Sequence, residues 1–173
     1  MTYALHIAQA SLMAGVATLL MALAVRRREW RGGFMAMGFI FLGVAINELD
    51  PFWKRLSLLD LDEPEILPIA ASLVLAGICA LRWRGSTWGA FGEVIHNRRF
   101  SLLAWGLLFV SLLPNVVRNR HLWQLLAPVV SDTRMLRDFA QEMTKAFGHF
   151  LLVNWIVLFL KDEWRRLVHQ LSP

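Results

Sequence analysis

Charged residues are scarce in this sequence. Asp, Glu, Lys and Arg make up 18% of its 173 residues, whereas a soluble domain carries about 25%. Hydrophobic residues make up 57%, and the mean hydropathy is +0.48. A soluble domain of this length could not bury so much apolar surface, so the excess must face lipid or a very large partner. The charges fall in short runs between apolar stretches, which is the pattern of membrane spans and their loops.

The sequence also lacks the short motifs of common enzymes and metal proteins. Its single cysteine, Cys79, excludes an internal disulfide, and neither a CxxC nor a zinc-ligand spacing occurs. It contains no HExxH, EF-hand, P-loop, GxGxxG or GxSxG motif. We therefore expect neither a serine hydrolase nor a cytochrome, since no histidine pair inside the apolar segments could ligate haem. The net charge of +5 does not indicate nucleic-acid binding, because the arginines lie beside apolar segments.

Five apolar segments are candidates for transmembrane helices. They cover residues 4–25, 33–49, 66–82, 100–117 and 143–160. A hydrocarbon core of about 30 Å requires roughly 20 helical residues. The first and fourth segments come close to that length, whereas the others need flanking residues or local thinning of the bilayer. The fifth is the weakest when taken alone. The first segment has arginines after it rather than before it, so we expect a retained span and not a cleaved signal peptide.

The distribution of basic residues predicts the orientation. With the N-terminus outside, the inner segments hold 11 basic residues and the outer segments hold 7. Positive residues favour the cytoplasmic side. The sequence therefore predicts a multi-pass protein of a bacterial-type inner membrane, with its N-terminus outside and its C-terminus in the cytoplasm. Six of the eight tryptophans lie near predicted span ends, the depth that indole rings prefer.

The connecting segments predict further helices. Asp50 and Pro51 resemble an N-cap followed by proline at the first helical position, so we expect a short helix over 51–59 that lies on the outer membrane surface. Pro114 should kink the fourth span near its outer end. A helix that starts near Thr133 can continue to Leu160 as one long helix that contains the fifth span. The predicted fold is thus an all-α bundle of about five spans in a single domain, residues 1–173.

Two sets of polar residues should lie at the outer membrane boundary. One set shares a face of the long helix at spacings of four, three and four: Asp138, Glu142, Lys145 and His149. Glu142 and Lys145 can pair on that face. The other set ends the second span: Asn47, Glu48 and Asp50. Gly43, Asn47 and Asp50 share a face that would let another helix approach closely.

The functional hypothesis is that these sets converge on one outward-facing site. Its candidate catalytic residues are Glu48, Asp50, Glu142 and His149. Three carboxylates and an imidazole suit acid–base chemistry on a lipid headgroup. They also suit a divalent metal, with Glu48, Asp50 and His149 as its ligands. The candidate residues for binding a phosphate or headgroup are Arg118, Arg120 and Arg137.

A purely structural interpretation explains the same residues. Asp50 serves as a helix cap, and Glu142 and Lys145 form a pair on a helix surface. Glu48 terminates a span at the interface, where an ionised carboxylate costs far less than at the bilayer centre. His149 can hydrogen-bond a neighbouring backbone group. His6, His96 and His169 lie near loops or termini and receive no role.

Three functions are compatible with these features. The first is an auxiliary or interaction subunit that binds another membrane protein or itself, which small size and small residues on helix faces favour: Ala10, Gly15, Ala17, Gly38 and Gly43. The second is a membrane enzyme that acts on a lipid or lipid-linked substrate at the outer leaflet. The third is an ion or small-molecule pathway formed by an oligomer, although no inverted repeat is visible.

Overall fold

The computed structural model describes residues 2–49, 66–119, 123 and 133–171. These residues are helical almost throughout, and no strand occurs among them. The prediction of an all-helical fold is therefore confirmed. The chain forms two compact units, residues 1–98 and 99–173, and each is described by itself. The single-domain assignment stays a prediction.

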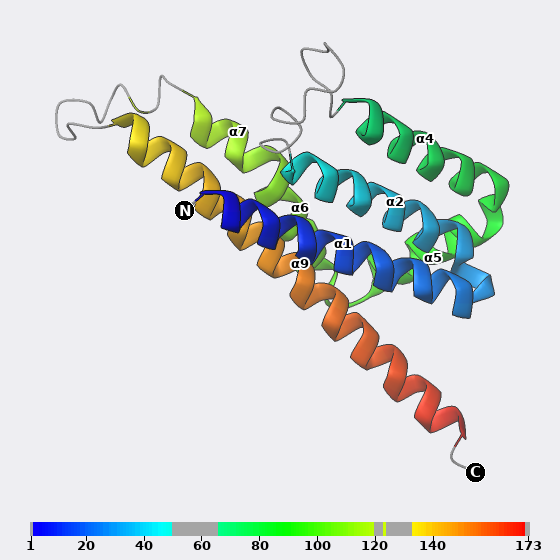
Figure 1. Cartoon of the computed structure of the whole chain (residues 1–173). Coiled ribbons are helices and arrows are strands. Elements are labelled where there is room, and N and C mark those ends of the chain that lie inside the picture. The colour runs from blue at the N-terminus through cyan, green and yellow to red at the C-terminus, as the bar shows by residue number, and fades with distance from the viewer. Residues whose placement is uncertain (1, 50–65, 120–122, 124–132, 172–173) are drawn as a thin grey trace. The chain divides into compact units, whose positions relative to one another are not determined.

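In the first unit, one helix lies between two others. The central helix is α2, Arg31–Glu48, and it packs against both α1, Thr2–Arg26, and α4, Ile66–Arg82 (Figure 1). A short 3₁₀ turn, η1, connects α1 to α2 over Arg28–Trp30. The last helix of the unit, α5, covers Arg84–His96 and packs against α2 and η1. Both α1 and α4 run antiparallel to α2, as the contacts of His6 with Glu48 and of Gly43 with Ser72 indicate.

Glycines bring α2 close to both flanking helices. A Cβ atom at Gly38 would lie 2.8 Å from Met21 Cγ on α1. A Cβ atom at Gly43 would lie 2.5 Å from Ser72 Oγ on α4. Lipid supplies no hydrophobic driving force for helix association, so helices in a membrane gain stability from this kind of close backbone contact.

The N-terminal end of α2 is equally close to α5. A Cβ atom at Gly32 would lie 2.7 Å from Trp83 Cβ, and one at Gly33 would overlap Ala90 Cβ. The Gly32 amide donates a hydrogen bond of 2.9 Å to Ser86 Oγ. This bond satisfies one of the backbone N–H groups that the first turn of a helix leaves without a partner.

The second unit is an antiparallel helix pair. Its first arm runs through α6, Phe100–Leu107, then η2, Leu108–Leu112, and α7, Leu113–Arg118. Its second arm is α9, Thr133–Leu171, drawn from yellow to red in Figure 1. Three contacts set the register, pairing Gly106 with Leu152, Gly148 with Val110 and Arg99 with Asp162. Glycine faces a branched side chain at two of these contacts, so the two arms interlock closely.

The first arm contains a π-helical turn where the sequence predicts a kink. Pro114 cannot donate to the Val110 carbonyl, and its ring crowds that group. The helix widens over Leu108–Leu112, where the Leu113 amide donates to the Leu108 carbonyl. A π turn of this kind re-satisfies the backbone without ending the helix, and residues 100–118 continue as one candidate span.

Several apolar helices could cross a membrane. Among the described residues, four are long and apolar enough: Ala4–Arg26, Arg28–Glu48, Phe100–Arg118 and Arg134–Arg165. The count becomes five if the bent pair α4–α5, whose axes differ by 104°, is taken as one span. The fifth predicted segment lies within α9, whose 39 residues meet the requirement of length and apolarity without another helix. The 17-residue α4 qualifies only together with α5.

Two further expectations have clear outcomes. The long helix predicted from Thr133 is confirmed, and it extends beyond Leu160 to Leu171. The residues between the third and fourth predicted spans, for which the sequence predicts no helix, contain α5. The predicted interfacial helix over 51–59 lies outside the described residues.

The glycine contacts make opposite predictions for two alanine substitutions. Gly33→Ala should lower the free energy of unfolding by about 1–3 kcal/mol, because the methyl group meets Ala90 and the α5 backbone, which cannot move aside. Gly77→Ala on α4 is the matched control, since a Cβ there has nothing within 4 Å. It should raise stability by up to about 1 kcal/mol through helix propensity. Unfolding of the purified proteins in mixed micelles measures both, and equal effects would contradict the packing described.

Candidate functional site

A contact between His6 and Glu48 joins the N-terminal end of α1 to the C-terminal end of α2. His6 Nδ1 lies 3.5 Å from Glu48 Oε2, and the Glu48 side chain is only 2% exposed. The antiparallel register of the two helices produces this contact, since the first turn of α1 lies beside the last turn of α2. A charge removed from water is tolerated when it is paired. The structure thus assigns a partner to the predicted site residue Glu48.

A third polar side chain lies one turn further along the same face of α1. Gln9 is 2% exposed, and neither its amide nitrogen nor its carbonyl oxygen has a hydrogen-bond partner among the described residues. Burying an amide without partners costs about 1–3 kcal/mol. Together, His6, Gln9 and Glu48 form what we call the α1–α2 polar cluster.

The second unit carries its own polar face on α9. Lys145 Nζ lies 3.6 Å from Glu142 Oε1, which confirms the pairing predicted from their spacing. His149, one turn further along, is 1% exposed. The hydroxyl of Thr144 donates to the Ala140 carbonyl within the same helix. Along α9, the predicted polar face therefore begins with charged side chains and ends with the buried imidazole of His149.

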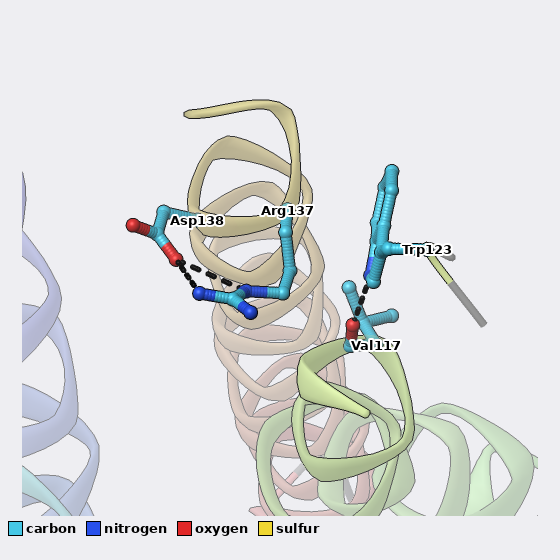
Figure 2. Close-up of polar contacts among 4 residues, drawn as sticks. All are labelled: Val117, Trp123, Arg137 and Asp138. Atoms are coloured by element: carbon cyan, nitrogen blue, oxygen red, sulfur yellow. Dashed lines mark hydrogen bonds and ion pairs between the residues drawn. The ribbon is translucent and has the colours of Figure 1, made fainter. Parts of the chain in front are cut away.

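The beginning of α9 shows a different arrangement. Figure 2 shows Arg137 directed toward Asp138, with Nε and Nη2 each 3.5 Å from Asp138 Oδ1. Asp138 is largely exposed, so it does not extend the buried part of the stripe. In the same view the Trp123 indole donates a 2.5 Å hydrogen bond to the Val117 carbonyl. That carbonyl belongs to the last turn of α7, where helix acceptors need an outside partner.

The predicted site residues fall into both units. Glu48 belongs to the first unit, whereas Glu142, His149 and the headgroup candidates Arg118 and Arg137 belong to the second. Arg118 is exposed. Two further candidates, Asp50 and Arg120, lie outside the described residues. The convergence of all these groups on one site stays a prediction.

The described residues give no metal-binding group of their own. No cluster of three or more His, Cys, Asp or Glu side chains that could hold a metal ion occurs among them. The predicted ligand set includes Asp50, which is not described, and takes Glu48 and His149 from different units. A divalent metal therefore stays part of the functional hypothesis alone.

Sequence reasoning missed His6 and Gln9. Both lie on the face of α1 that continues through the buried Met13, Val16 and Leu20. The sequence signal that could have found them is their spacing, since both continue the heptad pattern of these apolar residues toward the N-terminus. Asn47 was expected on a face of close helix approach, but it is exposed. Its predicted neighbour Gly43 does make such a contact, with Ser72.

Comparisons with known proteins identify no relative. The chain matches no protein family, and no curated protein or solved structure is significantly similar to it.

Proposed function

We propose that this chain is a small multi-pass protein of a bacterial-type inner membrane and acts as an interaction subunit that binds a transmembrane helix of another membrane protein. The observation that carries the proposal is a row of small residues on the exposed side of α1, the side that does not pack within the first unit. Small side chains follow each other on that face at heptad spacing, and all are exposed: Ala8, Ser11, Gly15, Thr18 and Ala22. We call this the α1 track.

The α1 track differs from the other small residues in the unit. Ala10, Ala17, Gly38 and Gly43 are buried within the first unit, so its own packing uses them. At Gly15, by contrast, a Cβ atom would have nothing within 4 Å. Interfaces between transmembrane helices are enriched in such small residues, because they let two backbones approach.

The chemistry of the α1 track also suits a helix better than a polar ligand. The Thr18 hydroxyl already donates to the Ala14 carbonyl at 2.9 Å, so it does not require an outside acceptor. The exposed face of α4 offers a comparison, since it carries the large aliphatic side chains that suit lipid: Leu73, Val74, Ile78 and Leu81. The exposed large side chains of α1, Ile7, Leu12 and Leu19, lie beside the track and not on it, so the small residues leave room for another helix.

Site-specific photocrosslinking tests this role. A photoreactive residue at Ser11 or Ala22 should form an adduct with a membrane protein in cells, whereas the same residue at Val74 on α4 should not. Gly15→Leu should remove the Ser11 adduct because its side chain blocks the approach of a helix. Gly77→Leu, at an open glycine of α4, is the matched control.

The mass of the adduct identifies the partner. An adduct of twice the chain mass would show that the partner is a second copy of this chain and not another protein. Equal crosslinking at Ser11 and Val74, or an adduct that persists in Gly15→Leu, would contradict the proposal.

The orientation belongs to the same proposal, with the N-terminus outside and the C-terminus in the cytoplasm. The contacts of the first unit support one point of it, since the arginines of the α1–α2 turn and of the α4–α5 corner lie at the same end. In a Cys79→Ser background, a membrane-impermeant maleimide should label Thr2→Cys in intact spheroplasts. Ser172→Cys should react only after the membrane is opened, and the reverse pattern would invert the orientation.

A second function is favoured by the α1–α2 polar cluster. A membrane enzyme that acts on a lipid-linked substrate at the outer leaflet needs buried acid–base groups, and the His6–Glu48 pair supplies an imidazole beside a carboxylate. The buried amide of Gln9 offers both a donor and an acceptor to a substrate. A metal held by Glu48, Asp50 and His149 would belong to this function.

Separate substitutions test the enzymatic alternative. Glu48→Gln, His6→Gln and His149→Ala should each abolish complementation of a deletion strain, because each removes a proton-transfer group. Asp138→Asn, at an exposed carboxylate, should complement normally. Each variant is compared only if its expression level and unfolding midpoint match those of the unsubstituted protein, so that a loss of complementation does not result from misfolding. If folded Glu48→Gln and His149→Ala both complement fully, the catalytic role of this site is excluded.

A further inference from the structure

The end of the first unit opposite the polar cluster forms a corner of unusual composition. It consists of residues 26–31, at the turn between α1 and α2, and residues 82–98, which include α5. We call it the basic corner. Its parts are in contact, since a Cβ at Gly89 would lie 3.6 Å from Trp30 Cδ1, and Ser86 Oγ accepts the Gly32 amide.

The helix α5 has two apolar faces. Thr87, Ala90 and Val94 are buried against the unit. On the other side Trp88, Phe91 and Ile95 follow each other at helical spacing, and Trp88 is 68% exposed. Thirteen residues make a helix of about 20 Å, which is too short to cross the hydrocarbon core. The 104° bend after α4 turns α5 across the direction of α4 instead of continuing it.

The basic corner carries more positive than negative charges. It contains seven arginines and two glutamates. Two arginines lie over indole rings, Arg27 at 5.1 Å from the Trp30 centroid and Arg31 at 6.0 Å from that of Trp83. Such stacking orients a guanidinium. Arg27 Nη1 also donates to Glu29 Oε1 at 3.1 Å, so Glu29 offsets part of the positive charge of the corner. The other five arginines are exposed: Arg26, Arg28, Arg82, Arg84 and Arg98.

We propose that α5 is an interfacial helix and that the basic corner is a docking surface for anionic phospholipid. Trp88, Phe91 and Ile95 enter the acyl boundary, and the surrounding arginines bind headgroup phosphates. An apolar helix face with basic flanks is the arrangement that holds a helix in the plane of an anionic membrane. The inference rests on the membrane location of the chain and is independent of the α1 track.

Charge substitution tests headgroup binding. The protein is placed in nanodiscs of equal phosphatidylcholine and phosphatidylglycerol, and native mass spectrometry then counts the lipids that remain bound. The protein should retain phosphatidylglycerol preferentially. Arg28→Gln/Arg84→Gln should lower that preference by about tenfold or more, since each basic residue near an anionic surface contributes about fivefold. Both side chains are exposed, so the fold should persist.

A control of equal charge makes the result specific. Arg134→Gln/Arg165→Gln removes two exposed arginines of the second unit and should leave the preference near that of the unsubstituted protein. Arg28→Lys/Arg84→Lys should retain most of it. An equal loss in the control, or no preference in the unsubstituted protein, overturns the proposal.

Spin labels test the position of α5. In a Cys79→Ser background, a label at Ile95→Cys should collide with oxygen dissolved in lipid, whereas one at His96→Cys should collide with a water-soluble nickel complex. Both positions are exposed. If the label at residue 95 is reached by nickel, α5 does not enter the membrane. If neither reagent reaches it, a protein partner covers the face instead of lipid, and the proposal is wrong.

Discussion

The first unit depends on how closely three helices approach the backbone of α2. Each approach passes through a glycine, Gly38 toward α1, Gly43 toward α4 and Gly33 toward α5. In a bilayer, apolar side chains gain nothing by leaving lipid for one another, so contact distance and not apolarity would decide which helices pair. The glycines therefore permit the close antiparallel packing in which the other contacts of the unit are made.

The α1–α2 polar cluster is a consequence of that register. Residue spacing along one chain can predict a pair such as Glu142 and Lys145, because both lie on the same helix. It cannot predict that His6 lies beside Glu48, since 42 positions separate them and the packing of α1 against α2 brings them together. The elements of the site were thus visible in the sequence, but the partner of its most buried carboxylate was not.

Hydropathy predicted the long helices well and failed where a helix is neither long nor uniformly apolar. The predicted segments 4–25, 66–82 and 100–117 correspond closely to α1, α4 and the α6–α7 arm. The helix α5 was missed because arginines flank it and glycines interrupt it, so its residues resemble a loop. Its inward face shows only two helical repeats, Thr87, Ala90 and Val94, and those side chains become a helix face only against Gly32 and Gly33.

The electrostatics of helix ends then explain why the two ends of the unit differ. A carboxylate at a helix C-terminus is unfavourable by itself. Glu48 nevertheless ends α2, because the antiparallel α1 brings the positive pole of its N-terminus and His6 to the same place. At the opposite end, Arg26 and Arg82 meet the negative poles of α1 and α4, but Arg28 and Arg31 lie at the positive pole of α2. Glu29 pairs with Arg27, but the two glutamates of the basic corner cannot balance its seven arginines. The remaining positive charge favours an anionic surface beyond the chain as its partner.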